Sequence, residues 1–373
     1  MQQGALTLVC LGHLNWDHVW QRPQHLMSQF ARRCRVVYID PPQTVGAHET
    51  ARLHEQPGDN GVRVLRPLLP AGQEEKNSQA LSQQMASILA ECGPNTILWI
   101  YSPIAAMFVA LAKSHTRLTV YDCMDDYASF QTGFAPSQMR SQEAFLMSLV
   151  DLVFTGGHSM YQARKDRHPR VHCFPSGVQV AHFQQVRDPG LDVPPEIADL
   201  PHPRLGYFGV LDERLDWNLI RAVAERRPTW QWLLIGPEDS TIPGELPRAA
   251  NIHYLGQQPY QKLPAYLKGF DIATMPFALN DATRSISPTK TLEYLGGGTP
   301  VLSSSVPDVV AFYNEIVYIA DGVDAWIERV DEIVAATPDQ LQSRLERAQP
   351  ILEQSSWDSI ADRMWSLMQE RLR

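Results

Sequence analysis

Several patterns that mark common classes of membrane protein and exported protein are missing from this sequence of 373 residues. It contains no run of about 18 apolar residues, which excludes a membrane-spanning helix of ordinary length. The residues before the first apolar run, which begins near Ala5, include no basic leader, no apolar core and no small-residue cleavage site. We therefore expect a cytoplasmic protein.

The sequence is also poor in cysteine and in the short motifs of several enzyme classes. Its five cysteines are scattered and never spaced as C-x-x-C, so we expect free thiols and neither a disulfide framework nor a zinc site. No G-x-G-x-x-G follows the first apolar run, and a Walker lysine loop, H-E-x-x-H and G-x-S-x-G are absent. These absences argue against a dinucleotide-binding enzyme, a P-loop hydrolase, a zinc protease and a serine hydrolase.

Acidic residues outnumber basic residues. Lys and Arg number 32 against 41 Asp and Glu, and the net charge of −9 argues against general binding to nucleic acid. Residues 1–190 are close to neutral, whereas the remainder carries almost all of the negative charge. Because a chain of this length exceeds what one core usually supports, two domains explain this uneven charge best.

Two successive series of short apolar runs alternate with helix-like stretches. The runs are apolar on both faces and end at Gly, Pro or Asp, which is typical of parallel strands covered by helices. We predict strands at 6–12, 35–40, 62–66, 96–101, 118–122, 152–156 and 171–175, and then at 205–209, 231–236, 252–255, 271–276, 300–304 and 316–319. We predict helices at 23–33, 76–91, 104–113, 138–149, 217–226, 264–268, 288–295 and 323–334.

A proline-rich segment separates the two series. Residues 186–203 predict a linker, because clustered prolines exclude a helix or a central strand. The linker divides an N-terminal domain, 1–185, from a C-terminal domain, 204–355, and we expect the last helix, 356–373, to pack back on the N-terminal domain. Both domains are predicted to be α/β and doubly wound, with ligands bound at the carboxyl ends of the strands in a cleft between the domains.

The most informative segment, 283–301, reads T-R-S-I-S-P-T-K-T-L-E-Y-L-G-G-G-T-P-V. We expect Ser287 to be the N-cap of a helix and Pro288 its first residue. The N–H groups and dipole at that end favour an anion such as a diphosphate, and Lys290 adds a cation. Glu293 lies on roughly the same face, where its carboxylate could accept hydrogen bonds from two ribose hydroxyls. The alternative is an ordinary capped helix with a glycine stop.

This segment resembles the donor-binding helix of retaining GT-B glycosyltransferases of the E-x7-E type (glycosyltransferase group 1, family 4). In that family the second glutamate of the motif binds the ribose, and its position matches Glu293. The first glutamate falls on Ser285, so the chain resembles a subset with S-P-x-K-x-x-E in this helix. The resemblance implies a GT-B fold, with two Rossmann-like domains facing a cleft, and transfer of a sugar from a nucleotide diphosphate-sugar.

Other segments carry the same resemblance. Residues 205–212, L-G-Y-F-G-V-L-D, resemble the strand and glycine turn that open the donor domain. Gly209 would let the backbone approach the donor phosphates, and Arg214 is a candidate phosphate partner; the alternative for the glycine is the requirement of a tight turn alone. Loops after the next two strands are expected to hold the nucleotide base, which makes Gly236 and Gln258 candidate donor-binding residues.

The N-terminal domain offers a candidate acceptor segment in its first loop. Residues 12–24 read G-H-L-N-W-D-H-V-W-Q-R-P-Q, and His13, Trp16 and Arg22 are the candidate acceptor-binding residues. Aromatic faces and paired polar groups suit sugar rings, which present apolar C–H faces and fixed hydroxyls. The alternative is a tryptophan-rich packing corner.

Three carboxylates are candidate catalytic residues. Asp17 lies in the same loop, and Asp125 and Asp126 lie in the run Y-D-C-M-D-D-Y at 121–127. If the reaction inverts the anomeric centre, Asp125 or Asp126 would act as a general base with a pKa near the working pH. If it retains, the leaving phosphate can take the proton and the acids orient the acceptor. The resemblance favours retention; the alternative for the acids is a solvated or helix-capping role.

We predict a glycosyltransferase that moves a sugar from a UDP-sugar to a saccharide or lipid-linked acceptor in surface polysaccharide or glycoconjugate synthesis. We expect no cofactor and no essential metal, because no D-x-D-type pair lies beside the expected phosphate site. Two alternatives stay open: a nucleotide-sugar epimerase of the same fold, and a non-catalytic nucleotide-sugar-binding subunit of a polysaccharide assembly complex. Arginine clusters at 32–35 and 164–170 add the hypothesis of contact with anionic lipid at the inner membrane face.

Overall fold

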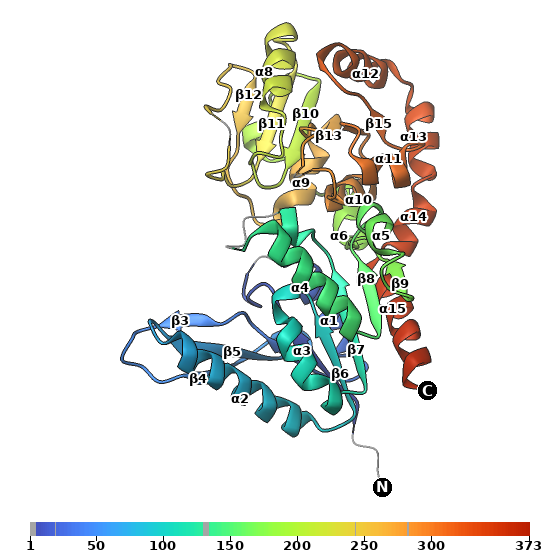
Figure 1. Ribbon diagram of the computed structural model, residues 1–373. Helices are drawn as coiled ribbons and strands as arrows, with labels where there is room; N and C mark the ends of the chain where they lie inside the picture. The colour runs from blue at the N-terminus through green and yellow to red at the C-terminus, as the bar shows by residue number, and fades with distance from the viewer. Residues whose placement is uncertain (1–4, 19, 130–133, 243, 282) are drawn as a thin grey trace. The chain divides into compact units, whose positions relative to one another are not determined.

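The computed structural model describes residues 5–18, 20–129, 134–242, 244–281 and 283–373 (Figure 1). The chain divides into two compact units. Unit 1 comprises Met1–Pro175 together with Trp357–Arg373, and unit 2 comprises Ser176–Ser356. The observed division therefore falls after Pro175, earlier than the predicted domain end at residue 185, and the final helix belongs to unit 1.

Unit 1 is built on a largely parallel sheet with the strand order β3-β5-β2-β1-β6-β7-β8-β9, in which β4 pairs antiparallel with β5. Its described strands are β1 (Thr7–Leu11), β2 (Arg35–Ile39), β3 (Gln43–Val45), β4 (Arg52–Pro57), β5 (Arg63–Pro70), β6 (Thr96–Ile100), β7 (Leu118–Cys123), β8 (Leu152–Thr155) and β9 (Val171–Cys173).

Helices cover both faces of this sheet (Figure 1). Its helices are α1 (Arg22–Phe30), α2 (Glu74–Cys92), α3 (Ala106–Ala112), α4 (Pro136–Leu149), α5 (His158–Arg164) and α15 (Trp357–Leu372). In β1, Leu8 and Cys10 enter the core shared with α1 and α15, whereas Val9 and Leu11 enter the core shared with α2, α3 and α4. Alternate side chains of a strand point to opposite faces, so two covered faces require the continuous apolar run that the sequence shows.

Unit 2 is a second doubly wound unit, with the strand order β12-β11-β10-β13-β14-β15 and parallel pairing throughout. Strand order reverses between β10 and β13, which is where ligands bind in such folds. Its strands are β10 (Arg204–Phe208), β11 (Gln231–Ile235), β12 (Ile252–Tyr254), β13 (Ile272–Met275), β14 (Val301–Ser303) and β15 (Tyr318–Ile319). Its helices are α6 (Val180–Gln184), α7 (Pro195–Ala198), α8 (Trp217–Arg226), α9 (Leu263–Lys268), α10 (Thr289–Gly297), α11 (Pro307–Tyr313), α12 (Val323–Ala335), α13 (Pro338–Glu346) and α14 (Gln349–Gln354).

The proline-rich segment 186–203 is not a free linker, and this prediction was wrong. It contains α7, and Ile197 of that helix is fully buried in the core of unit 2. The guanidinium of Arg204 donates hydrogen bonds to the carbonyl oxygens of Ala198 and Leu200, which holds the end of the segment against β10. Prolines exclude a long helix here, but they do not prevent an irregular segment from burying an apolar side chain.

All five cysteines are free thiols, and Cys10 and Cys123 are buried. Among the described residues, no helix combines the length and the apolar character that a membrane span requires.

Candidate active site

Two glycine turns at the carboxyl ends of β10 and β11 mark the predicted donor side of the site, in unit 2. A Cβ atom on Gly236 would lie 1.8 Å from the carbonyl oxygen of Gly209, and the two residues have φ of +150° and +153°. The Gly209 N–H donates to the carbonyl oxygen of Ile235 at 2.9 Å. The two strand ends therefore approach more closely than residues with side chains allow. Contact of either glycine with a donor stays a prediction.

Helix α10 follows the loop that begins after β13. It begins at Thr289 with Pro288 as N-cap, so the predicted cap at Ser287 and first helical residue at Pro288 are each wrong by one position. The reason lies in Pro288, whose ψ of 114° is extended and not helical. No side chain caps the helix, which ends at Gly298 in the left-handed region. Among the described residues, the first-turn N–H groups therefore lack a side-chain cap, and such a helix end is suited to bind an anion.

Lys290 lies in the first turn of α10 and Glu293 begins the second turn on the same face, as the three-residue spacing predicts. Lys290 Nζ lies 3.6 Å from Glu293 Oε2 and 6.0 Å from the centroid of the Phe208 ring. Its Cε would lie 3.3 Å from a Cβ on Gly209, so the lysine extends over the first glycine turn. Glu293 Oε2 is buried, and among the described residues it accepts no hydrogen bond. A cation and a buried carboxylate oxygen that accepts no hydrogen bond among the described residues thus form an ion pair beside the glycine turn.

Glu293 has tyrosine neighbours. Burial, and then the nearby charge of Glu293, raise the pKa of the Tyr260 hydroxyl. The Tyr294 hydroxyl, on the other face of α10, accepts a hydrogen bond from the N–H of Phe208 at 3.0 Å and ties the helix to β10. Tyr294 therefore anchors α10 in the core of unit 2, while Glu293 lies toward the carboxyl ends of the strands.

Two other predicted donor residues are engaged within the protein. Arg214 Nε donates to both carboxylate oxygens of Asp212, at 3.0 and 2.8 Å, so much of its charge is neutralised and its role as a phosphate partner is disfavoured. Gln258 Nε2 donates to the carbonyl oxygen of Leu255 at 2.8 Å, which closes the loop after β12. A pocket of about 420 Å³ follows β11 and includes Glu238, in the loop predicted to hold the base.

In unit 1, the loop after β1 brings His13 to the ends of two neighbouring strands. Its ring centroid lies 5.2 Å from that of Tyr101, which follows β6, and 6.3 Å from that of Tyr127, which follows β7. His13 Nδ1 and both tyrosine hydroxyls are buried, and none has a hydrogen-bond partner among the described residues. Burial lowers the pKa of His13 to about 4. His13, Leu14, Asn15 and His18 line a pocket of about 520 Å³ with residues 41–44.

The other two predicted acceptor residues are structural. Arg22 is 2% exposed, and its guanidinium donates to both carboxylate oxygens of Asp122 and to the carbonyl oxygen of Phe174. Trp16 is 4% exposed and packs in the core against Tyr38. Direct contact of either side chain with an acceptor is therefore a prediction that the structure contradicts. A buried arginine and a buried tryptophan look the same in sequence as exposed ones.

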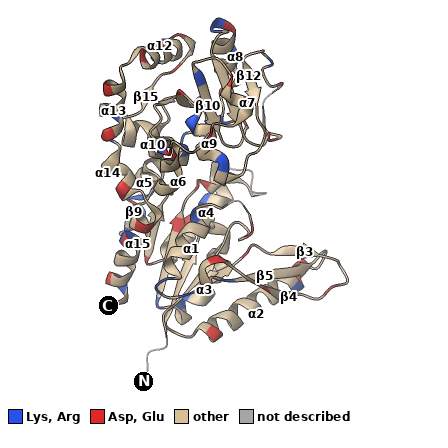
Figure 2. Cartoon of the chain, turned by 180° about the vertical axis from the view of Figure 1, so that it is seen from behind, with Lys and Arg blue, Asp and Glu red and all other residues tan. Residues whose placement is uncertain are grey.

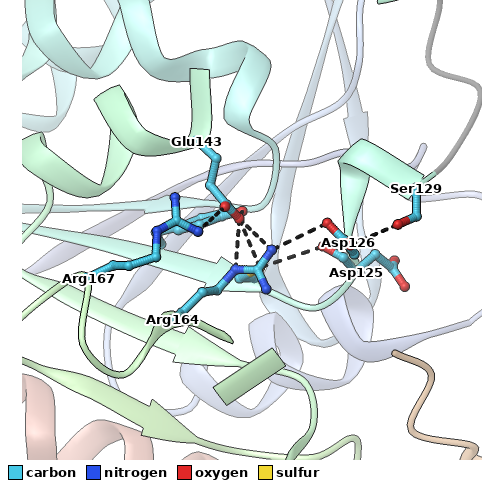
Figure 3. A network of polar contacts seen from close by, with 8 residues as sticks. Asp125, Asp126, Ser129, Glu143, Arg164 and Arg167 are labelled. Atoms are coloured by element: carbon cyan, nitrogen blue, oxygen red, sulfur yellow. Dashed lines mark hydrogen bonds and ion pairs between the residues drawn. The ribbon is translucent and has the colours of Figure 1, made fainter. Parts of the chain in front are cut away.

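The candidate catalytic carboxylates have different surroundings. Asp17 is largely exposed and pairs with Arg66 at 2.9 Å. Asp126 Oδ2 accepts from the hydroxyl of Ser129 at 2.8 Å, and its Oδ1 lies 3.5 Å from Arg164. Figure 3 shows the carboxylate of Asp125 directed away from Arg164. Asp125 thus lies next to the arginine network, with its carboxylate on the side opposite Arg164.

This network joins α4 and α5 to the loop after β7 (Figure 3). Glu143 of α4 is buried and receives hydrogen bonds from Arg164 Nε at 2.8 Å and from Arg167 Nη1 at 2.8 Å. The Tyr121 hydroxyl donates to the same carboxylate at 3.2 Å. Arg164, which is itself buried, thus connects Glu143 to Asp126 and fixes the loop that carries Asp125.

Sequence reasoning missed Tyr101, Tyr127, Glu143 and Arg164. Tyr101 and Tyr127 each follow a strand, and that position was the available signal, because the carboxyl ends of parallel strands gather functional groups. Glu143 offered a weaker signal, as a carboxylate at a position of α4 that faces the core.

The arginines of the two clusters have partners within the chain. Arg32 and Arg33 pair with Asp358 and Asp362 of α15, and Arg35 pairs with Glu91. Figure 2 shows acidic and basic positions interspersed along α15. Arg164 and Arg167 share Glu143, as described above. Among the described residues, no group of three or more His, Cys, Asp or Glu side chains is placed to hold a metal ion.

Comparison with known proteins relates part of the chain to glycosyltransferases. Residues 202–336 match the family model described as "Glycosyl transferases group 1", a range that includes both glycine turns and α10. The Bacillus subtilis (strain 168) protein named "Putative teichuronic acid biosynthesis glycosyltransferase TuaH" is 23% identical over 216 residues, which are 53% of this chain and 53% of that protein. The chain therefore matches about half the length of this curated relative.

Two solved structures resemble nearly the whole chain. Sucrose-phosphate synthase from Thermosynechococcus elongatus has a TM-score of 0.73 at 14% identity, with 98% of each chain covered. The UDP-forming α,α-trehalose-phosphate synthase from Burkholderia xenovorans, in complex with glucose-6-phosphate, has a TM-score of 0.72 at 11% identity and covers 98% of this chain and 100% of its own. The fold of this chain is accordingly GT-B, and its residues 202–336 match the group 1 glycosyltransferase model.

Proposed function

We propose that the chain is a glycosyltransferase that binds a nucleotide diphosphate-sugar in unit 2 and transfers the sugar to a saccharide or lipid-linked acceptor. The observation that carries this proposal is the N-terminal part of α10, where Lys290 extends over Gly209 and its ammonium lies 3.6 Å from the buried Glu293 Oε2. The match of residues 202–336 to group 1 glycosyltransferases supports it independently.

The geometry supports a division of roles within the donor. The diphosphate would lie against the uncapped N–H groups of α10 and Lys290, where the helix dipole and the ammonium offset its charge. Glu293 would accept hydrogen bonds from two ribose hydroxyls, which would satisfy its buried oxygen. Because these groups offset the diphosphate charge, the proposal includes transfer without an essential metal.

In the reaction, the bond between the anomeric carbon and the diphosphate oxygen breaks and a bond to the acceptor oxygen forms. The acceptor hydroxyl loses its proton to the leaving diphosphate if configuration is retained, or to Asp125 if it is inverted. We propose retention, with Asp125 orienting the acceptor. The proposal also includes a UDP donor, an acceptor in surface polysaccharide or glycoconjugate synthesis and action in the cytoplasm. The names of the two relatives, UDP-forming and teichuronic acid biosynthesis, support the first two points.

Donor binding is tested by calorimetry of the full chain with UDP, GDP, ADP and TDP, each with and without EDTA. We expect one diphosphate, UDP, to bind without added metal and to lose binding in Glu293→Ala. Glu332→Ala is the matched control, because Glu332 pairs only with a neighbouring arginine on α12 among the described residues and is about half exposed. Failure of all four diphosphates to bind would contradict the proposal.

Turnover separates the proposed transferase from its two alternatives. Incubation with the UDP-sugar that binds should release UDP only when an acceptor is present. Epimerised product from the donor alone would identify an epimerase. Tight donor binding with no consumption, across a panel of saccharide and lipid-linked acceptors, would identify a binding subunit.

A further inference from the structure

Three buried polar atoms that have no hydrogen-bond partner among the described residues meet at one edge of the unit 1 sheet. They are Nδ1 of His13 and the hydroxyls of Tyr101 and Tyr127, here called the polar triad. The three residues follow β1, β6 and β7, which are neighbours in the sheet. Other buried atoms without partners among the described residues include the indole N–H groups of Trp99, Trp232 and Trp326, which lie scattered in strands and helices. In the triad, all three atoms belong to residues that follow neighbouring strands, and the His13 ring contacts the rings of Tyr101 and Tyr127.

The polar triad adjoins a pocket through His13. This pocket of about 520 Å³ lies between the loops after β1 and β2, and its walls combine polar and apolar side chains. Leu14, Pro41 and Pro42 supply the apolar surface, and Asn15 and Gln43 supply amide groups. Such a lining suits a sugar ring, which presents C–H faces and hydroxyls. A sugar hydroxyl both donates and accepts, so it can pair with a tyrosine hydroxyl or with either tautomer of histidine.

The residues around the polar triad offer no charge for an anion. The pocket lining contains neither lysine nor arginine. Arg22 is committed to Asp122 and to a carbonyl oxygen, and Arg66 is committed to Asp40 and Asp17. Burial holds the pKa of His13 at about 4, so its ring is neutral at pH 7. A phosphate or carboxylate placed here would lose its hydration without gaining a counter-charge.

We propose that the polar triad and the adjoining pocket bind an uncharged sugar ring, so that the acceptor presents a neutral sugar in unit 1 and not a sugar phosphate or a uronate. This inference rests on the proposed function and specifies its acceptor class. It assigns to Tyr101 and Tyr127 the recognition of sugar hydroxyls, and to His13 a neutral hydrogen-bonding role.

The test is saturation-transfer NMR on the full chain without nucleotide. The probes are neutral methyl glycosides of glucose, galactose, mannose and N-acetylglucosamine, together with glucose 6-phosphate and glucuronate as anionic counterparts. We expect at least one neutral glycoside to receive saturation and neither anion to do so. Binding of only the anionic sugars, or of no neutral glycoside, would overturn the inference.

Substitutions connect the signal to the polar triad. Tyr127→Phe and Tyr101→Phe each remove a hydroxyl that has no hydrogen-bond partner among the described residues, so the thermal midpoint should stay constant or rise while sugar affinity falls at least tenfold. Tyr266→Phe in unit 2 is the matched control. Its hydroxyl donates to Glu196, so that variant should lose stability and keep sugar binding.

The same protein samples distinguish the remaining outcomes of the sugar-binding experiment. Unchanged sugar affinity in both triad variants would contradict the inference, and circular dichroism verifies that each variant is folded. UDP binding, measured in parallel, keeps the two proposals apart. A chain that binds UDP but no neutral sugar contradicts this inference alone, whereas a chain that binds no diphosphate contradicts the proposed function.

Discussion

Arg22 and Asp122 form a two-pronged ion pair inside unit 1, with Nε–Oδ2 and Nη2–Oδ1 distances of 2.9 and 2.8 Å and both side chains almost wholly buried. The residues are far apart in sequence, and the pair joins the start of α1 to β7. A buried pair of this kind makes each partner depend on the other, because a single charge left in an apolar interior is costly.

Replacement of Arg22 by methionine should therefore destabilise the protein. We expect the free energy of unfolding to fall by about 3–5 kcal/mol, because Asp122 would keep a buried charge without a partner. Arg32→Met removes an exposed pair with Asp358 and should cost less than about 1 kcal/mol. Urea denaturation of both variants measures the difference. Unchanged stability of Arg22→Met together with weakened sugar binding would restore the acceptor role that the sequence had suggested.

Replacement of Gly236 by alanine should distort the donor side. Its Cβ would overlap the carbonyl oxygen of Gly209, so the two strand ends must separate. We expect loss of stability and at least a tenfold loss of UDP affinity by calorimetry. Gly322→Ala is the matched control, since Gly322 has φ of +78° with no atom within 4 Å of the added carbon. That variant should pay only the backbone strain, roughly 1–2 kcal/mol, and bind UDP normally.

Replacement of Glu293 by glutamine should lower activity without lowering stability. Glu293→Gln and Lys290→Ala should each lower kcat/KM at least tenfold, which corresponds to about 1.4 kcal/mol or more of lost transition-state stabilisation. Without ligand, Glu293→Gln should change the unfolding midpoint little, because it removes the ion pair with Lys290 together with a buried charge that accepts no hydrogen bond among the described residues. Steady-state kinetics and thermal unfolding test the two effects. Near wild-type rates in both variants would contradict the assigned donor site.

Stability should fall on acidification through two partly buried histidines. Burial lowers the pKa of His13 to about 4 and that of His25 to about 3, whereas an unfolded histidine titrates near pH 6.5. Below pH 6.5 each of these histidines is protonated in the unfolded chain but stays neutral in the folded chain. The free energy of unfolding therefore falls by up to about 1.4 kcal/mol per pH unit for each histidine. The loss should continue to about pH 4 for His13 and about pH 3 for His25.

The measurement is the slope of unfolding free energy against pH between 6.5 and 4.5 in urea titrations. His13→Gln and His25→Gln should each reduce the slope relative to wild type, whatever their effect at pH 7. His115→Gln is the control, because the ring of His115 is exposed and contacts only the neighbouring Ser114 among the described residues. An equal slope in all four proteins would contradict the burial argument.

The arginine network should influence turnover through the position of the loop after β7. Arg164→Met removes the contact to Asp126 and leaves Glu143 with fewer donors in a buried site, so we expect lower stability and a lower kcat. Arg167→Met removes a more exposed partner of the same carboxylate and should have a smaller effect on both. Because the network lies in unit 1, UDP affinity should be unchanged. A fall in UDP affinity with constant kcat would contradict a positioning role.

The parts of the fold that the sequence predicted are those that local pattern determines. Strands such as β1 and β10 are short apolar runs buried on both faces, and their limits were predicted to within about one residue. Strands β3 and β4 escaped prediction because they are polar and mostly exposed, and they owe their extension to pairing with β5. The pattern of residues within one segment does not reveal which strand it will pair with elsewhere in the chain.

The same distinction applies to the site. Lys290 and Glu293 come together because three residues in a helix place them on one face, so sequence alone sufficed. His13, Tyr101 and Tyr127 come together only because β1, β6 and β7 are neighbours, and strand order is a property of the whole sheet. The prediction that Arg22 binds the acceptor was wrong for a related reason. The sequence does not show that the fold places β7, with Asp122, beside α1.

The return of the chain to unit 1 has a consequence for its synthesis on the ribosome. Unit 2 is continuous in sequence, so all of its strands and helices have emerged before α15 does. Unit 1, by contrast, keeps its apolar surface beside α1 uncovered until Trp357, Ile360, Met364 and Met368 are translated. The part of the protein that begins first is therefore completed last, and the nascent chain carries a surface in need of protection throughout the synthesis of unit 2.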